Sequence, residues 1–497
     1  MIPHYETYRY TDELCKLKAQ SIVECRLPGS EITAVLAVQA VAVPTECACA
    51  DGETRYGGKL VLSILYEDAE RKICRAERGA EFFHKAEHVS ISPACFAKAR
   101  LNADNITVRR EGSGLYIAVI VGAEICVYET AKTEYLTGGE GLITRKNNLT
   151  VARLSCAFGE TEREDEFDAD YVGDILLHSE NLIVTNARAG AGQIDIDGEM
   201  SLNVCALKSD GTLCAYERLI PFAIRIPSEE AFGNVSVNAN VYMRSANLTA
   251  GVDEEKGRSK IVLTTTIAAD CVLQVKDELL AVDDAFSKTC EVTLKKEKQR
   301  GRYLTNIDKY VERISGAAAM SDEMDENGTL TAAVCPRVEV ACKKTERGGY
   351  EVEGVVQADV IFQTADGAHK KSVLSLPVAF PIECDGDYVE AEAIVYGLNV
   401  RRRKSGETEA EGALKVVVKT YEEFSSEYVS EAEEGAAYEE NDCGVSIFLP
   451  KAGEDLWQVS KRLKRAPEEL EKSNPDMKFP VEKGERILVY RKIGENL

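Results

Sequence analysis

One pattern occurs three times in this chain and constrains its fold more than any other feature. Apolar and polar residues alternate on both sides of a glycine, namely Gly58, Gly198 and Gly354, which are 140 and 156 residues apart. Alternation of this kind is typical of a strand with one buried face, and a glycine within it indicates a bulge or a close backbone approach. A recurrence at this spacing predicts tandem all-β units. The three stretches are Tyr56–Tyr66, Ile194–Val204 and Tyr350–Phe362.

The residues after each glycine also recur. Asp210-Gly211 and Asp366-Gly367 follow the second and third copies, and Asp-Gly between apolar runs predicts a hairpin turn. Each partner strand then reaches a proline-bounded apolar stretch, Ile220–Ile224 or Leu376–Pro381. The first copy has Ala80–Phe83 at this place and lacks the proline, so it is the most divergent of the three.

Each copy closes with a further pair of predicted strands. A unit therefore holds roughly five to seven strands, enough to form a sandwich or barrel-like core of its own. Helices are expected only as connectors, at Asp277–Ser287 and Ile307–Met324. The closing pairs are Ala99–Arg110 with Leu115–Val127, Val235–Gly251 with Lys260–Val275, and Val389–Arg401 with Ala413–Tyr421.

The repeats and a change in composition divide the chain into five parts. We expect three mainly β units at residues 1–153, 154–302 and 303–430. Residues 431–442 contain six acidic side chains and little to bury, which is typical of a solvated, self-repelling linker. Residues 443–497 form a separate small domain.

Charge and composition exclude several classes of protein. The net charge is −24, whereas a nucleic-acid interface needs clustered Lys and Arg. This charge is uneven, because the residues from Cys443 onward carry +2 and the rest carry −26. No apolar run approaches the roughly 20 residues that cross a bilayer, and no export signal precedes the first unit, so we expect a cytosolic protein. The 16 cysteines are then expected to be reduced, small hydrophobic residues.

The signatures of catalysis and metal binding are missing. His84 and His88 are four residues apart, but Lys85 follows the first histidine where a zincin has glutamate. Cys47 and Cys49 have no second pair at zinc-site spacing. No Walker loop or Gly-x-Ser-x-Gly elbow occurs. We therefore predict no enzymatic activity, no cofactor and no metal.

The C-terminal residues show the start and stop signals of two short helices between two strands. Val445–Leu449 is an apolar strand that Pro450 ends, and Asp455 is placed to cap the first helix. Pro467 suits the first turn of the second helix, and Asn474-Pro475 ends it. After a turn at Gly484, Ile487 and Val489 lie in the second strand. Leu456, Val459, Ser460 and Leu463 have helical spacing and are expected to face the small core.

This order, with Gly453–Trp457, Asn474-Pro475 and Gly484–Val489, resembles the LysM module, a βααβ unit that binds N-acetylglucosamine glycans. Repeated β units followed by an acidic linker and one LysM module are similar to the SPOCS-domain proteins of spore-forming Firmicutes. The resemblance implies a structural protein of spore coat assembly in the mother-cell cytoplasm, at the forespore surface. It implies docking of the LysM module to a coat morphogenetic protein of the SpoIVA type. Peptidoglycan or cortex binding and self-association through β edges remain as alternatives.

The resemblance also places a binding groove between two loops. By this likeness the groove is lined by Gly453, Glu454, Asp455 and Leu456 on one side and by Pro475, Asp476, Met477, Lys478 and Phe479 on the other. The module core is expected to contain Trp457, Leu463, Leu470, Ile487 and Val489.

Two features of this module depart from the common pattern. Glu454 and Asp455 replace the Asp and Thr of the usual Gly-Asp-Thr-Leu loop, which adds a carboxylate and removes a hydroxyl. Lys461, Arg462, Lys464 and Arg465 give the first helix a basic face, which is either solvated surface or a surface for an acidic protein.

Overall fold

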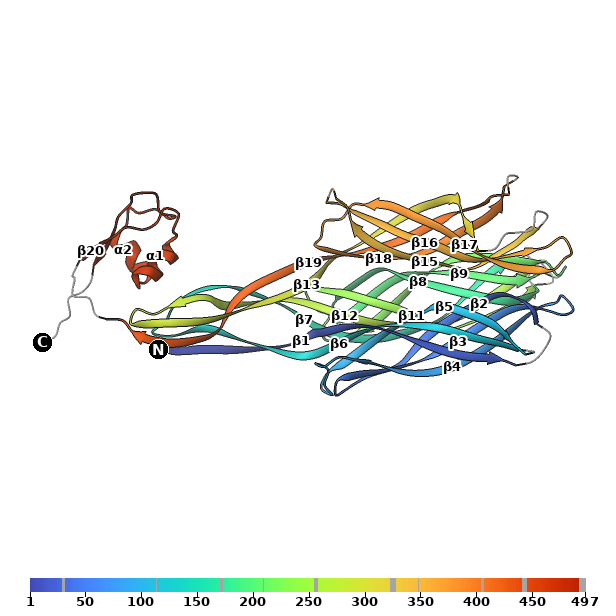
Figure 1. The fold of residues 1–497 in the computed structure, drawn as a ribbon, viewed down its shortest axis with the longest axis horizontal. Helices are drawn as coiled ribbons and strands as arrows, with labels where there is room; N and C mark the ends of the chain where they lie inside the picture. Colours follow the sequence, from blue (N-terminus) through green and yellow to red (C-terminus); the bar gives the residue numbers. More distant parts are fainter. Residues whose placement is uncertain are drawn as a thin grey trace.

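The molecule is built almost entirely of antiparallel β-strands (Figure 1). The computed structural model describes residues 1–28, 32–112, 114–169, 173–208, 210–253, 258–321, 328–346, 348–403, 406–439 and 445–490. The prediction of a mainly β protein is confirmed. The two expected connector helices are wrong: residues 277–286 belong to a strand, β12, and residues 307–317 belong to another, β13. Residues 322–324 of the second predicted helix lie outside the described residues.

The first unit consists of two three-stranded sheets in the orders β1-β6-β5 and β2-β3-β4. Both sheets are antiparallel, and their buried side chains meet in one hydrophobic cluster. The strand bounds are β1 Ile2–Leu27, β2 Ile32–Ala50, β3 Glu53–Asp68, β4 Ile73–Glu87, β5 Phe96–Glu111 and β6 Gly114–Glu140.

The second unit repeats this topology, with sheet orders β11-β12-β7 and β10-β9-β8. The predicted Asp210-Gly211 turn joins β9 to β10, and Gly211 has a φ of +83°. This value lies in the left-handed region that glycine enters without steric cost. The strand bounds are β7 Ile143–Ala169, β8 Asp174–Gly190, β9 Gln193–Leu207, β10 Leu213–Pro227, β11 Val235–Asp253 and β12 Arg258–Phe286.

The third unit has the same two sheets, in the orders β13-β19-β18 and β14-β17-β16-β15. It differs by the two-residue strand β14, which pairs with the outer edge of β17. The strand bounds are β13 Cys290–Ala317, β14 Ala319–Met320, β15 Thr329–Lys344, β16 Tyr350–Gln363, β17 His369–Ile382, β18 Tyr388–Arg402 and β19 Thr408–Ala437.

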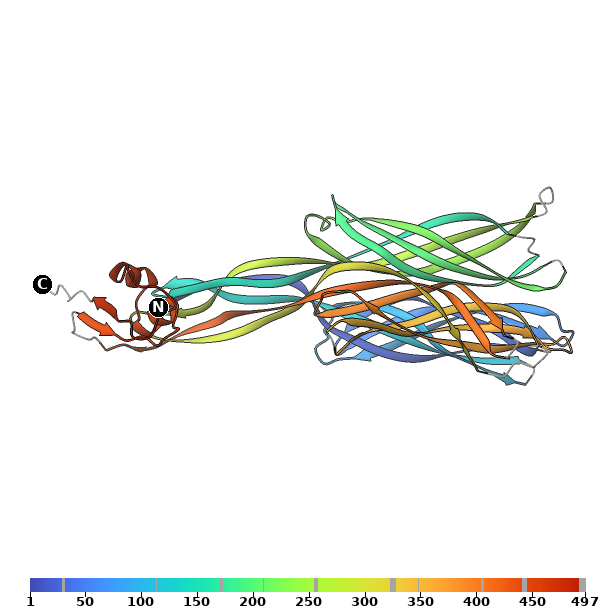
Figure 2. The same cartoon turned by 90° about the horizontal axis from the view of Figure 1, so that it is seen from above.

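A narrow stalk extends from the three units (Figures 1 and 2). It forms because the first and last strands of each unit are 26 to 30 residues long and pair beyond the sandwich. The resulting ribbons, β1/β6, β7/β12 and β13/β19, share buried clusters along the stalk. The stalk clusters comprise Tyr10, Tyr135, Leu149, Val151, Ala281 and Tyr428, and then Leu136, Val282, Ala285, Val429 and Ala432.

These long strands change the predicted domain limits. The expected boundaries at residues 153 and 302 fall inside β7 and β13, and the chain passes between units at residues 141–142 and 287–289 instead. Residues 431–437 are largely exposed, as expected, but they are not a free linker. They end β19 and pair with the start of β13, where Glu431 lies opposite Lys295. Residues 440–444 and 491–497 of the predicted linker and C-terminal domain lie outside the described residues.

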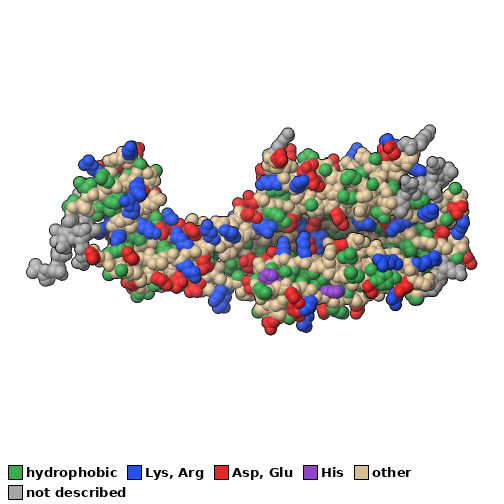
Figure 3. All heavy atoms as spheres, viewed as in Figure 1, with side chains coloured by type: hydrophobic (Ala, Val, Ile, Leu, Met, Phe, Trp, Pro, Cys, Tyr) green, Lys and Arg blue, Asp and Glu red, His purple; other side chains and the backbone are tan. Residues whose placement is uncertain are grey.

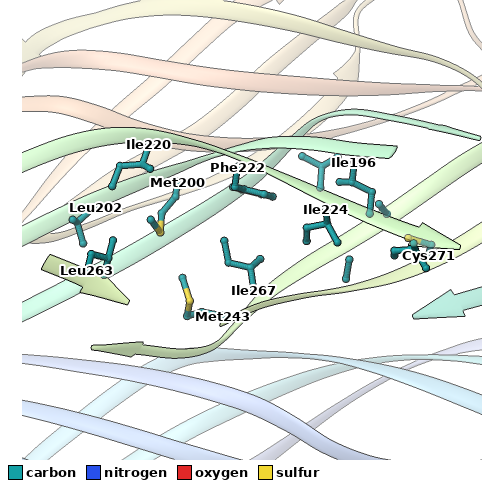
Figure 4. Close-up of a cluster of buried hydrophobic side chains, with 14 of the residues drawn as sticks. Ile196, Met200, Leu202, Ile220, Phe222, Ile224, Met243, Leu263, Ile267 and Cys271 are labelled. Atoms are coloured by element: carbon teal, nitrogen blue, oxygen red, sulfur yellow. The ribbon is translucent and has the colours of Figure 1, made fainter. Parts of the chain in front are cut away.

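Each unit has its own core between its two sheets. In the second unit Ile196, Met200 and Leu202 of β9 face Leu263 and Ile267 of β12 (Figure 4). Burial of each such side chain contributes about 1.5–3 kcal/mol toward folding. All 15 cysteines among the described residues are free.

A further cluster joins the three units to one another. The first unit contributes Leu36 and Leu65, the second Leu177 and Cys205, and the third Ile361, together with their buried neighbours. Burial raises the pKa of the Cys205 thiol to about 12, so this thiol stays protonated and behaves as a small apolar group. The shared cluster makes the three units one packed body.

The repeated glycines are sites of close approach, as the pattern predicts. Gly58 lies opposite Phe82, and Gly198 opposite Phe222, at the same position of the first and second units. A bulge in the preceding strand lies beside each of these glycines. A Cβ atom at Gly198 would overlap the Phe222 ring and lie 2.7 Å from the carbonyl oxygen of Ile183.

The substitution Gly198→Ala is therefore expected to lower the free energy of unfolding by about 1–3 kcal/mol, because the obstructing carbonyl cannot move without disturbing its strand. The matched control is Gly251→Ala in β11, where the nearest atom to the new Cβ is 3.9 Å away. Chemical denaturation of both variants measures the difference. Equal stability of the two would contradict the close approach.

Candidate binding site at the stalk tip

The C-terminal module lies beside the tip of the stalk (Figure 1). Its elements are β20 Val445–Phe448, α1 Leu456–Leu463, α2 Pro467–Ser473 and β21 Ile487–Tyr490. The two strands pair antiparallel, with Phe448 opposite Ile487. The buried cluster of the module consists of Val459, Leu470, Val481, Ile487 and Val489.

The predicted core residues have two different placements. Leu470, Ile487 and Val489 lie in the buried cluster, and Leu463 packs against it. Trp457 lies outside the cluster, and its assignment to the module core is corrected by the structure. The residue faces the stalk, where its indole N–H finds an acceptor that the module core does not offer.

Both acidic residues of the first loop are engaged within the module. Asp455 accepts a hydrogen bond from the Gln458 N–H at 2.7 Å, and the Gln458 side chain accepts one from the Asp455 N–H, so α1 begins with a capping box. Glu454 accepts from the Lys451 N–H at 2.8 Å and pairs with Arg462. Burial acts to raise the pKa of Glu454, but these two partners outweigh it and hold the pKa below its ordinary value.

The first of the two groove loops, defined as residues 453–456 and 475–479, pairs with Val481, two residues beyond the second loop. The Gly453 N–H donates to the Val481 carbonyl at 2.8 Å, and the Val481 N–H donates to the Glu454 carbonyl at 2.9 Å. Asn474 joins the second loop to β21 by accepting from the Leu488 N–H at 2.8 Å and donating to its carbonyl.

Side chains of the groove loops divide between surface and core. Gly453, Asp455, Pro475, Asp476 and Lys478 are exposed. Glu454 and Leu456 are partly buried, and Met477 and Phe479 pack against the module core. The outer residues are therefore available to a ligand, while the inner ones hold the loops in place.

Asp284 of β12 is the main contact between stalk and module. Its side chain is 13 % exposed, and each of its oxygens has a partner. The Trp457 indole N–H donates to Oδ2 at 2.8 Å, and the Lys461 ammonium donates to Oδ1 at 2.6 Å. Burial raises the pKa of Asp284, but the hydrogen bonds from Lys461 and Trp457 outweigh burial and hold the pKa below its ordinary value.

Aromatic and cationic groups complete the contact. The Trp457 ring lies edge-on to Phe286, with ring centres 5.3 Å apart. The guanidinium of Arg145 lies over the same indole at 5.6 Å and is held by Asp283. Lys288 of the stalk pairs with Glu469 of α2.

The basic face of α1 is thus engaged within the chain itself. Lys461 binds Asp284, Arg462 binds Glu454, Lys464 lies over the Tyr438 ring, and Arg465 pairs with Glu469. Figure 3 shows Lys and Arg side chains where the module approaches the stalk. Of these four side chains, Lys461 binds a carboxylate of the stalk, whereas Arg462 and Arg465 bind carboxylates of the module itself.

Sequence reasoning did not find Asp284, Phe286 or Arg145. They lie in stretches that carry no binding motif, and Asp284 and Phe286 fall in a segment with an apparent helical pattern. Their partner Trp457 is 173 residues from Asp284 along the chain. No local signal links positions so far apart.

The other candidate residues named from the sequence, His84 and His88, do not form a site in the structure. His84 lies in β4 beside Tyr56 and Phe82, and so shares no helix face with His88. Among the described residues, no three His, Cys, Asp or Glu side chains are grouped to hold a metal ion. A search of the same residues finds no helix with the length and apolar content needed to cross a membrane.

No protein-family model matches the chain, and searches of curated proteins and of solved structures found no match.

Proposed function

We propose that this protein is a non-enzymatic structural adaptor of spore coat or spore envelope assembly. In this proposal the three-unit β body is a scaffold, and the C-terminal module is a LysM domain that docks to a coat morphogenetic protein. The observation that supports it most directly is the orientation of the module. Its Trp457 side is held against the stalk, while residues of both groove loops remain exposed at the far end of a long, packed body.

The order of parts supports the same proposal. Repeated β units followed by one C-terminal LysM-like module resemble the SPOCS-domain proteins, among them the clostridial SpoIVA-interacting protein. The SpoIVA-type partner is proposed on the basis of this resemblance. The expected location is the mother-cell cytoplasm at the forespore surface.

A protein partner suits the groove loops better than a glycan does. Asp455 and Glu454 already accept hydrogen bonds within the module, and the loop lacks the hydroxyl of the common LysM pattern. One isolated module also has none of the avidity that tandem modules gain. Asp476 and Lys478 instead offer exposed charges of both signs, which suits polar contacts with a protein.

The test measures binding of the purified full chain to a purified SpoIVA-type morphogenetic protein. We expect saturable binding that Lys478→Glu weakens at least tenfold, because the reversed charge lies on an exposed groove loop. The matched control is Lys472→Glu on α2, outside the groove loops, which is expected to bind as the unchanged chain does. Equal weakening by both variants would refute docking through the groove.

The second candidate is an N-acetylglucosamine glycan of peptidoglycan or cortex. It is favoured by the pairing of the first loop with Val481, which holds the first loop close to the end of the second loop on one side of the module. Titration of the full chain with chitin oligomers separates the two candidates. If chitin oligomers bind at micromolar concentration and Lys478→Glu weakens this binding, the ligand of the groove is a glycan and not a protein. If neither the oligomers nor the morphogenetic protein binds, both candidates are wrong.

A further inference from the structure

The face of α1 that meets the stalk has two functional groups. Trp457 and Lys461 are four residues apart, so they lie on one side of the helix. The side chain of Trp457 provides an apolar ring with an N–H donor, and that of Lys461 provides a cation. Both groups bind the same carboxylate, that of Asp284.

The stalk presents a matching pair from a strand. Asp284 and Phe286 are two residues apart in β12, so their side chains leave the same face of the strand. A β-bulge at Asp283 shifts the register of β12 against β7 at this point. Bulges re-aim side chains, and here Asp283 pairs with Arg145 while the next residue, Asp284, faces the module.

The match between these surfaces is both polar and apolar. The Asp284 carboxylate is buried: Oδ2 accepts from Trp457, and Oδ1 accepts from Lys461 and from the backbone N–H of Ala285. The Trp457 ring packs edge-on to Phe286. A tryptophan that combines ring packing with a hydrogen bond is typical of the residues that dominate binding energy in interfaces. A buried carboxylate that loses its donors is strongly destabilised. The Trp457–Lys461 side of α1 therefore complements a carboxylate beside an aromatic ring.

We propose that the Trp457–Lys461 face of the module is a recognition surface for a β-strand end that carries a carboxylate and an aromatic ring two residues apart. The stalk segment 284–286 occupies this surface as an intramolecular ligand. The surface is consequently masked, and a partner strand with the same two groups binds only by displacing the stalk. The proposal does not depend on which ligand the groove loops take.

The masking is tested with the fluorescence of the full chain, because Trp457 is its sole tryptophan. Asp284→Ala is expected to shift the emission to longer wavelength and to increase acrylamide quenching at least twofold, since the indole becomes hydrated. Lys461→Ala removes the second module partner of Asp284 and is expected to change emission and quenching in the same direction. This variant tests the same contact if Asp284→Ala does not fold. The control Asp476→Ala removes an exposed carboxylate of the same module. If Asp284→Ala and Lys461→Ala both have the emission maximum and the quenching of this control, the proposal is wrong.

Recognition is tested with a synthetic peptide of residues 280–288 as the probe. We expect it to reduce acrylamide quenching of Asp284→Ala and to bind the unchanged chain at least tenfold more weakly, because the stalk occupies the surface. A peptide with alanine in place of its Asp284 is expected to have no effect. The proposal of an intramolecular ligand is wrong if the peptide binds the unchanged chain as tightly as it binds Asp284→Ala. It is also wrong if the alanine peptide binds equally well, or if the peptide does not bind Asp284→Ala.

Discussion

Replacing Lys419 with methionine is expected to lower the free energy of unfolding by about 3 kcal/mol. Lys419 is 4 % exposed and belongs to a polar network that joins the three units. Its ammonium donates to Asn238 of the second unit at 3.0 Å and to Glu392 of its own unit at 3.3 Å. Methionine fills a similar volume but leaves the Glu392 carboxylate with Arg100 of the first unit as its remaining cation. The loss of charge compensation, and not a cavity, causes the expected effect.

The same substitution is expected to change the response to acid. Burial raises the pKa of Glu392, but Lys419 and Arg100 outweigh burial and hold it below the ordinary value of 4.5. A lowered pKa in the folded state contributes stability above about pH 4.5, and this contribution is lost as the pH falls through the lowered pKa. Without Lys419 the pKa rises, so the loss begins at a higher pH and the variant unfolds in weaker acid.

Denaturant unfolding at pH 7 and at several values below pH 5 measures both effects. The matched control is Lys309→Met in β13, which removes an exposed lysine and is expected to change the stability by no more than about 0.5 kcal/mol. Adding Glu392→Gln to Lys419→Met is expected to recover part of the lost stability, because the two side chains share one interaction. If Lys419→Met matches the Lys309 control, the buried ion network is not a source of stability.

The substitution Leu65→Ala is expected to lower the free energy of unfolding by about 2–5 kcal/mol. Leu65 is fully buried in the cluster that all three units share. Truncation removes three side-chain carbon atoms and leaves a cavity bordered by more than one unit. The expected result is a loss of stability that reaches beyond the first unit.

Hydrogen exchange distinguishes this effect from ordinary core damage. The control is Leu62→Ala, which removes an equally buried leucine from the core of the first unit alone. Both variants are expected to be destabilised, but Leu65→Ala is expected to accelerate exchange in the second and third units more strongly. Faster exchange confined to the first unit in both variants would show that the shared cluster does not couple the units.

Local patterns predicted much of the secondary structure correctly. The alternating residues around Gly198 lie in β9, the Asp-Gly pairs form hairpin turns, and Asp455 caps α1. These features depend on residues a few positions apart, which the sequence displays directly. The errors have a common origin. Residues 277–286 and 431–437 looked like a helix and a linker because few strands continue for nearly 30 residues. They are strands because neighbouring ribbons supply both hydrogen bonds and a shared core.

The sequence by itself determined the mainly β fold, the three repeats, the start of each short C-terminal helix and the end of the second, since periodicity, turn residues and caps act over short distances. Only the tertiary structure decided that the three units share one core, that their long strands form a stalk, and that Trp457 binds Asp284 of the stalk. Such choices depend on complementary surfaces between residues far apart in the chain. A single sequence contains both surfaces of each contact but does not mark which of them meet.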